Sequence, residues 1–224
     1  MTPIIEVSDE VVRNLKKSET PFNLSPPHGF KKGFIYVPSI RLYVAEKSHL
    51  EESWDKAQDS PLEKKLRMLK IPEFVKFLNH VENYDEKIYK KITRVRKPWR
   101  IELLDAYFIE RKDGFYVLTE NKRNTEKLKP ALMEERESEI SFKSWKEKPN
   151  LQGLPIPDIE EPNTNKDKLN YSPPENNGVA GFGMSPDGAI TLYCDLNPSS
   201  THLDVLRVRN CFSVESEKNL KRLK

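Results

Sequence analysis

Two cysteines and a histidine near the C-terminus are the residues whose types could bind a metal ion. Cys194, His202 and Cys211 lie eight and nine residues apart, a spacing that fits no common zinc site. His202 could instead act as a general base beside Asp195 or Asp204. A hydrolase or transferase of unrecognised family, built on these residues, is therefore the alternative to a non-catalytic function.

Catalytic motifs are otherwise absent from the sequence. It contains no HExxH, CxxC, GxSxG or phosphate-binding loop. The glycine-rich run at 178–183 is not followed by a helical pattern, so it does not predict a phosphate-binding helix N-terminus. Three aspartates (Asp187, Asp195 and Asp204) could bind a hard cation, although turn formation explains such residues more often. We predict no catalytic residue, no metal ligand and no cofactor.

The charge distribution argues against nucleic acid as the partner. The chain has 224 residues, with 38 basic and 35 acidic side chains and a net charge of +3. These charges are interspersed, whereas nucleic-acid binders concentrate theirs. Residues 94–100 form one basic cluster that includes a tryptophan. This cluster could contact phosphate, but it follows a predicted helix, where cations are stabilising in any case.

The sequence gives no sign of export or membrane insertion. No segment approaches the roughly 20 apolar residues of a membrane-spanning helix, and residues 1–17 lack the apolar core of a secretory signal. We expect synthesis in the cytoplasm and reduced cysteines. The final location is left open, including association with a cell surface or a virion.

Hydrophobic patterning predicts an α+β fold. Apolar residues recur at helical spacing after Pro72 and again between 85 and 95, and an Asp-Gly pair at 113–114 between alternating runs predicts a hairpin. Further elements are expected as an interrupted helix at 128–148, a loop at 149–174, and strands at 34–45 (broken at Pro38), 178–182, 189–194 and 205–212. We divide the chain into an N-terminal arm (1–30), one domain (31–214) and a charged tail (215–224).

Residues 176–214 differ in composition from the rest of the chain. They contain no Lys, Glu, Gln or Trp, although Lys and Glu are abundant elsewhere. Burial alone does not explain this absence, because the segment is rich in Ser, Thr, Asn, Asp, Gly and Arg. Short polar side chains and single aromatic ones are typical of adaptable binding surfaces, since they give contact at low entropic cost.

An ordered set of segments across residues 33–211 resembles a known family. These segments are FIYVPSIRLYVAEK, IPEFVKFL, ITRVRKPWRIELLDAYF, KDGFYVL, GVAGF, SPDGAITLYCDLNPSS and VLRVR. Together they are similar to the variable proteins of archaeal-type diversity-generating retroelements. The resemblance implies a C-type lectin fold with two helices and a mixed or antiparallel sheet, whose last strands carry a variable ligand-binding face at about 176–214.

The mutagenesis of this family would explain the missing residue types. It acts on adenines, chiefly in Asn codons, and the resulting codons cannot encode Lys, Glu, Gln, Trp or Met. Met184 is then a fixed position or a departure. Two further departures are Asp204, where the family has Gly, and Phe182, in the place of a frequent Trp.

The resemblance also implies a function and a set of binding residues. The protein would be a non-enzymatic ligand-binding protein that displays a hypervariable surface. Its partner would be a macromolecule, such as a protein on another cell or a virus. Nine positions of permitted residue type are implied as ligand-binding: Ser185, Ile190, Tyr193, Asp195, Leu196, Ser200, Thr201, His202 and Asp204. Tyr193 and His202 are the contacts we expect first, because each has an apolar body and a polar tip.

Overall fold

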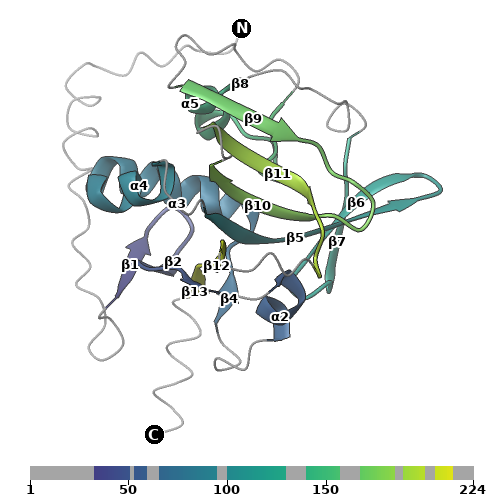
Figure 1. Cartoon of the computed structure of the whole chain (residues 1–224), viewed down its shortest axis with the longest axis horizontal. Coiled ribbons are helices and arrows are strands. Elements are labelled where there is room, and N and C mark those ends of the chain that lie inside the picture. Colours follow the sequence, from purple (N-terminus) through teal and green to yellow (C-terminus); the bar gives the residue numbers. More distant parts are fainter. Residues whose placement is uncertain are drawn as a thin grey trace, which may run out of the picture. The chain divides into compact units, whose positions relative to one another are not determined.

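The computed structural model describes residues 33–50, 53–59, 66–94, 100–129, 140–156, 167–184, 189–199 and 205–213 (Figure 1). The contacts within the chain define two units, Met1–Lys32 and Gly33–Lys224. All the described residues belong to the second unit. The predicted arm at 1–30 and the predicted tail at 215–224 lie outside the described residues.

A four-stranded antiparallel sheet joins the first described strands to the last. Its order is β1 (Phe34–Val37), β2 (Leu42–Ala45), β13 (Asn210–Ser213) and β4 (Arg67–Met68). The predicted break at Pro38 is confirmed, and the turn there contains Arg41 at a φ of 55°. Tyr43 stacks on Phe212 with ring centroids 5.0 Å apart, so side-chain packing as well as backbone pairing connects β2 to β13.

A larger sheet forms the centre of the fold. Its main path is β3 (His49–Leu50), β12 (Leu206–Val208), β5 (Ile101–Arg111), β10 (Val179–Met184), β11 (Ile190–Leu196), β9 (Lys168–Ser172) and β8 (Ile140–Ser141). β6 (Gly114–Thr119) pairs with β5, and β7 (Asn124–Lys127) pairs with β6. The predicted hairpin at 113–114 is confirmed as the β5–β6 turn. Figure 1 shows β5, β10, β11 and β9 side by side, so the segment of unusual composition builds the middle of the sheet.

Four helices occur among the described residues: α2 (Trp54–Asp59), α3 (Ile71–Tyr84), α4 (Glu86–Thr93) and α5 (Phe142–Glu147). Pro72 lies in the first turn of α3, and the Glu73 carboxylate accepts a hydrogen bond from the Lys70 amide. Asp85 follows α3 and caps α4 by accepting from the Ile88 amide. Both predicted helices are therefore confirmed. No helix in the described part of the chain is long and apolar enough to cross a membrane.

Aromatic side chains fill the core between α3, α5 and one face of the central sheet. Phe182 of β10 lies 5.0 Å from Phe74 and 6.0 Å from Trp145, measured between ring centroids. Trp145 is fully buried and its indole N–H donates to the Gly153 carbonyl at 2.8 Å. Burial without a partner would leave that donor unsatisfied, so the loop at Gly153 is part of the same core.

Two sequence predictions are wrong in the described residues. Within the predicted helix at 128–148, only Phe142–Glu147 is helical and Ile140–Ser141 is a strand; residues 130–139 lie outside the described part. The predicted loop at 149–174 contains β9, in which Leu169 and Tyr171 alternate into the core. The mixed α+β class is confirmed, but the longest strand, β5, lies between the helices and not near an end of the chain.

Candidate functional site

Four of the nine predicted ligand-binding residues are described, and all four belong to β11. Ile190, Tyr193 and Leu196 are half-buried, and Asp195 is exposed. Partial loss of solvent raises the pKa of the Asp195 carboxyl above its ordinary value. The other five, Ser185, Ser200, Thr201, His202 and Asp204, lie outside the described residues.

The four described residues do not all lie on the same face of β11. Leu192 and Cys194 point into the aromatic core, and Ile190 packs at its margin. Tyr193 and Leu196 instead pack on the opposite face, in a second cluster that contains Trp54 and Val179. A bulge opposite Val179 and Gly181 shifts the register and so brings residues three apart onto one face. The strand therefore supplies packing on both faces and one exposed carboxylate.

Three of the four described residues that flank the remaining predicted positions, Met184, Ala189 and Val205, lie at one end of the sheet; the fourth, Ser199, follows Leu196, which pairs with Val179 toward the opposite end. Met184 ends β10 and pairs with Ile190, the first residue of β11. Ile101 of β5 pairs with both Gly183 and Leu206, so β12 begins at this same end. Ser185 directly follows Met184 in the sequence, and Asp204 precedes Leu206 by two positions.

The two cysteines are free thiols in separate sheets. Cys194 of β11 and Cys211 of β13 are both fully buried. Burial raises the pKa of Cys211 to about 12 and raises that of Cys194 further above its ordinary value. Both are therefore protonated at neutral pH, and thiolate chemistry is suppressed. The described residues contain no group of three or more His, Cys, Asp or Glu side chains placed to hold a metal ion.

The catalytic alternative gains no support from the described residues. Asp195 is an exposed carboxylate at the end of β11, and its proposed partner His202 lies outside the described part. His80 is half-buried on α3 beside Tyr84. Partial burial lowers the pKa of His80.

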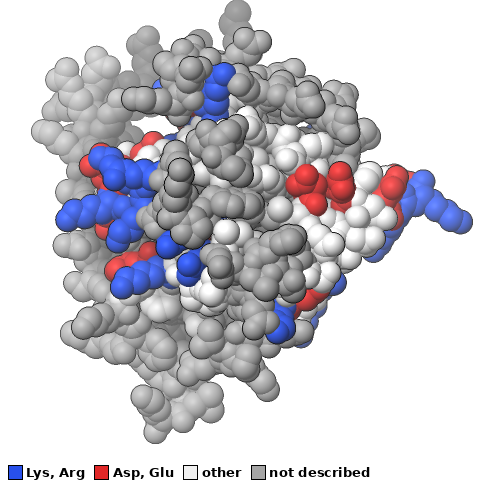
Figure 2. Space-filling view, in the orientation of Figure 1, with Lys and Arg blue, Asp and Glu red and all other residues white. Residues whose placement is uncertain are grey.

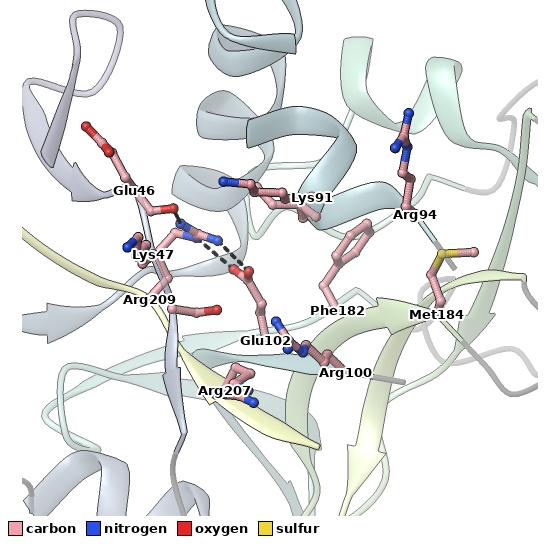
Figure 3. Close-up of a pocket in the computed structure, with 12 residues that line it drawn as sticks. Glu46, Lys47, Lys91, Arg94, Arg100, Glu102, Phe182, Met184, Arg207 and Arg209 are labelled. Atoms are coloured by element: carbon pink, nitrogen blue, oxygen red, sulfur yellow. Dashed lines mark hydrogen bonds and ion pairs between the residues drawn. The ribbon is translucent and has the colours of Figure 1, made fainter. Parts of the chain in front are cut away.

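A cavity of about 250 Å³ opens at the sheet end where β10 stops and β5 and β12 start (Figure 3). Its walls come from the β2–β3 connection, the last turn of α4, and strands β5, β10 and β12. Basic side chains dominate the lining, six against two carboxylates. The lining residues are Glu46, Lys47, Ser48, Lys91, Ile92, Arg94, Arg100, Glu102, Phe182, Met184, Arg207 and Arg209.

One pair of opposite charges forms the floor of this cavity. The Arg209 guanidinium donates from Nε and Nη2 to the two oxygens of Glu102, at 2.8 and 2.5 Å. Both residues are buried, and Arg209 also donates to the carbonyls of Ala45 and Glu46. A bidentate pair with its remaining donors satisfied is the arrangement in which a buried ion pair is tolerated. Glu102 is therefore already neutralised.

The other five cations of the cavity form no ion pair with a carboxylate in the described part of the chain, although Arg94 lies near enough to Glu86 to lower the pKa of that carboxyl. Lys47, Lys91 and Arg94 are exposed at the rim, whereas Arg100 and Arg207 are half-buried. The Nε atoms of Arg100 and Arg207 are buried without a hydrogen-bond partner. Figure 2 shows Lys and Arg side chains on the surface over α4, with Asp and Glu side chains among them; the excess of cations is a property of the cavity lining, not of that surface.

Sequence reasoning missed this cavity for a physical reason. Its cations come from three stretches that lie far apart in the sequence (47, 91–100 and 207–209), and only Arg94 and Arg100 belong to the basic cluster at 94–100. The helix C-terminus explanation fits Lys91, which lies in the last turn of α4. It does not account for Arg100 and Arg207, which β5 and β12 bring together because Arg207 pairs with Glu102.

Comparison with known proteins gives no relative for this chain: no family model, no curated protein and no solved structure matches it.

Proposed function

We propose that this protein is a non-enzymatic ligand-binding protein whose variable surface is diversified by a retroelement. The observation that carries the proposal is the absence of Lys, Glu, Gln and Trp from residues 176–214, together with the place of that segment at the centre of the sheet. Strands elsewhere in this chain, such as β5 and β7, do contain Glu or Lys.

The division between scaffold and loop supports the proposal. Phe182, Leu192 and Val208 are almost completely buried, so the strands of the segment can hold a constant frame. The other five of the nine predicted binding positions lie outside the described residues, and the proposal places them in connections, where substitution disturbs packing least. A mixed sheet with few helices agrees with the C-type lectin fold, and we include that finer assignment in the proposal.

The ligand in this proposal is a macromolecule, such as a protein on another cell or a virus. The residue types at the predicted positions are short polar side chains with single Tyr and His residues, which form hydrogen bonds and contact area without long flexible chains. Asp195 is the described position best placed for such contact, because it is exposed.

The DNA beside the gene provides the test. We expect a repeat nearly identical to the region that encodes residues 176–214, differing from it at adenines, and next to it a reverse transcriptase gene. Sequencing this region in several isolates should show substitutions concentrated at the nine predicted positions. Finding neither the repeat nor such variation would defeat the proposal.

A further inference from the structure

We propose that the basic cavity is a constant binding site for a phosphate monoester group. The site goes beyond the variable surface and does not depend on it, because Lys91, Arg94 and Arg100 lie outside residues 176–214. Arg207 lies inside that segment but is placed by its pairing with Glu102 of β5.

The charge balance of the cavity is the first argument. Five cations that form no ion pair with a described carboxylate line one small cavity, although Figure 3 shows Arg94 pointing away from the others. The only buried acid in the lining, Glu102, is occupied by Arg209. Figure 3 shows the carboxylate of Glu46 pointing away from the other labelled side chains. Like charges at this density repel one another unless an anion lies between them. The chain as a whole carries a charge of only +3, so this concentration is local.

The guanidinium groups of Arg100 and Arg207 are the second argument. Burial removes the Nε–H groups of Arg100 and Arg207 from water, and neither has a partner within the described residues. Guanidinium groups recognise phosphate oxygens through paired N–H donors. A phosphate oxygen in the cavity is no smaller than a water molecule, so it would accept from the terminal Nη groups of Arg100 and Arg207 and not from the buried Nε atoms.

The size and shape of the cavity favour a compact anion. A volume of about 250 Å³ is somewhat below the ~300–1,000 Å³ of sites for drug-sized ligands. It corresponds to roughly eight waters at ~30 Å³ each, which is room for one phosphate group and a small substituent. A nucleic-acid strand is instead followed by an extended basic groove. Cations from three stretches of the sequence line one compact cavity here.

The helix at the rim opposes an anion, but only weakly. The last turn of α4 supplies Lys91 and Ile92 to the cavity, and a helix C-terminus carries about −0.5 of an elementary charge. Lys91 and Arg94 offset this charge at the same place. The balance of the cavity therefore stays positive, and it suits a dianion such as a phosphate monoester better than a single carboxylate.

Titration calorimetry of the full-length protein with inorganic phosphate, at constant ionic strength, tests the site. We expect saturable binding to the wild type, and an affinity at least about tenfold weaker in the double variant Arg100→Gln/Arg207→Gln. The control Lys112→Gln/Arg123→Gln removes the same charge from exposed positions in the β5–β6 and β6–β7 turns and should change the affinity less than about twofold. Equal losses in both double variants, or no saturable binding to the wild type, would overturn the proposal.

A second variant guards against loss of folding in the first. Lys91→Gln/Arg94→Gln alters only exposed rim residues, and we expect it to weaken phosphate binding about three- to tenfold while the circular dichroism spectrum is unchanged. An unchanged affinity in this variant would contradict a site at the cavity.

Competition identifies the source of the phosphate. Glycerol 3-phosphate should displace inorganic phosphate, whereas acetate at the same ionic strength should not. Displacement by glycerol 3-phosphate supports a phosphorylated small molecule or group as the ligand, while its failure would restrict the site to the free ion and overturn the monoester assignment. Tighter binding of a single-stranded oligonucleotide, lost in Arg100→Gln/Arg207→Gln, would overturn it in favour of nucleic acid.

Discussion

The two ends of one sheet face have opposite chemistry, although residues only two positions apart build them. On β5, Leu104 lies in the aromatic core whereas Glu102 forms the floor of the basic cavity. On β10, Phe182 packs against Phe74, and Met184 on the same face reaches the cavity. A bulge shifts the register of β10 between Val179 and Gly181, but the main difference between the two ends is what covers the sheet.

The comparison shows two ways of burying a surface. The aromatic end is complete within the chain, because α3 and α5 supply apolar partners and Gly153 accepts from the Trp145 indole. The basic end is complete only where Arg209 meets Glu102; its other cations form no ion pair with a carboxylate in the described residues. Where the chain itself supplies partners for every buried group, the region contributes stability. Where charged groups lack partners in the chain, the region can bind a ligand of opposite charge.

The largest expected effect comes from breaking the aromatic end. Phe182→Ala removes a ring packed among Phe74, Phe142 and Trp145, and should lower the free energy of unfolding by about 3–5 kcal/mol. Urea denaturation measures the change. The control Phe115→Ala removes a half-buried ring beside the same core and should lose only about 1–2 kcal/mol. Similar losses in the two variants would contradict this account of the core.

Removing the Glu102–Arg209 ion pair at the basic end should give the second-largest loss of stability. Glu102→Gln leaves the buried Arg209 guanidinium without its counter-charge, and should lower the free energy of unfolding by about 2–4 kcal/mol. The hydrogen bonds from Arg209 to the carbonyls of Ala45 and Glu46 remain and limit the loss. Glu110→Gln, an exposed change on the same strand, should stay within about 0.5 kcal/mol of the wild type in the same denaturation experiment. A loss in Glu102→Gln no greater than in this control would contradict a structural role for the pair.

Sequence patterns predicted the elements whose contacts are local. The helix after Pro72 and the turn at 113–114 depend on spacing and caps that a few neighbouring residues supply, and both are confirmed. The strand at 168–172 was missed because its alternation of Leu169 and Tyr171 is short and lies among Pro and Asn residues, and because β9 depends on parallel pairing with β11. Pairing between distant segments leaves no mark in a local pattern.

The same reason limited the prediction of the site. Tyr193 and Leu196 were chosen by residue type, yet a bulge places both against Trp54 and its neighbours, and no local pattern shows where a bulge will occur. The basic cavity is assembled by the pairing of β12 with β5 and of β5 with β10. Arg100 and Arg207 are far apart in the sequence, so only the sheet topology brings them together.

Two glycines of β10, Gly181 and Gly183, lie next to the boundary between the aromatic end and the basic end of the sheet. An added methyl group at Gly183 would clash with the backbone carbonyl of Arg100, whereas at Gly181 it would meet the ends of the Ile101 and Leu196 side chains, at 2.5 and 2.6 Å. Side-chain ends move more easily than backbone. We therefore expect Gly183→Ala to lower the free energy of unfolding by about 2–3 kcal/mol and Gly181→Ala by about 1–2 kcal/mol.

Both glycine variants are compared by urea denaturation and by phosphate titration. Gly183→Ala displaces the backbone that carries Arg100, so it should also weaken phosphate binding, while Gly181→Ala should not. A larger loss of stability in Gly181→Ala than in Gly183→Ala would contradict this prediction. It would mean that β5 and β10 can move apart near Arg100 at little cost.

The last prediction concerns repulsion among the cations of the cavity, and its expected effect on stability is the smallest. Lys47→Gln removes an exposed cation at the cavity rim and should raise the free energy of unfolding by about 0.3–0.5 kcal/mol at low salt without phosphate, because repulsion among the cations falls. Added sodium chloride should remove this gain by screening. With saturating phosphate the order of stability should reverse, since the wild type binds the anion more tightly and is stabilised by mass action.

Lys112→Gln, at the β5–β6 turn, is the control, and it should show neither the gain nor the reversal in matched thermal denaturation. If the two variants behave alike in all three conditions, the cations of the cavity do not repel one another appreciably, and the basic end is as complete within its own chain as the aromatic end.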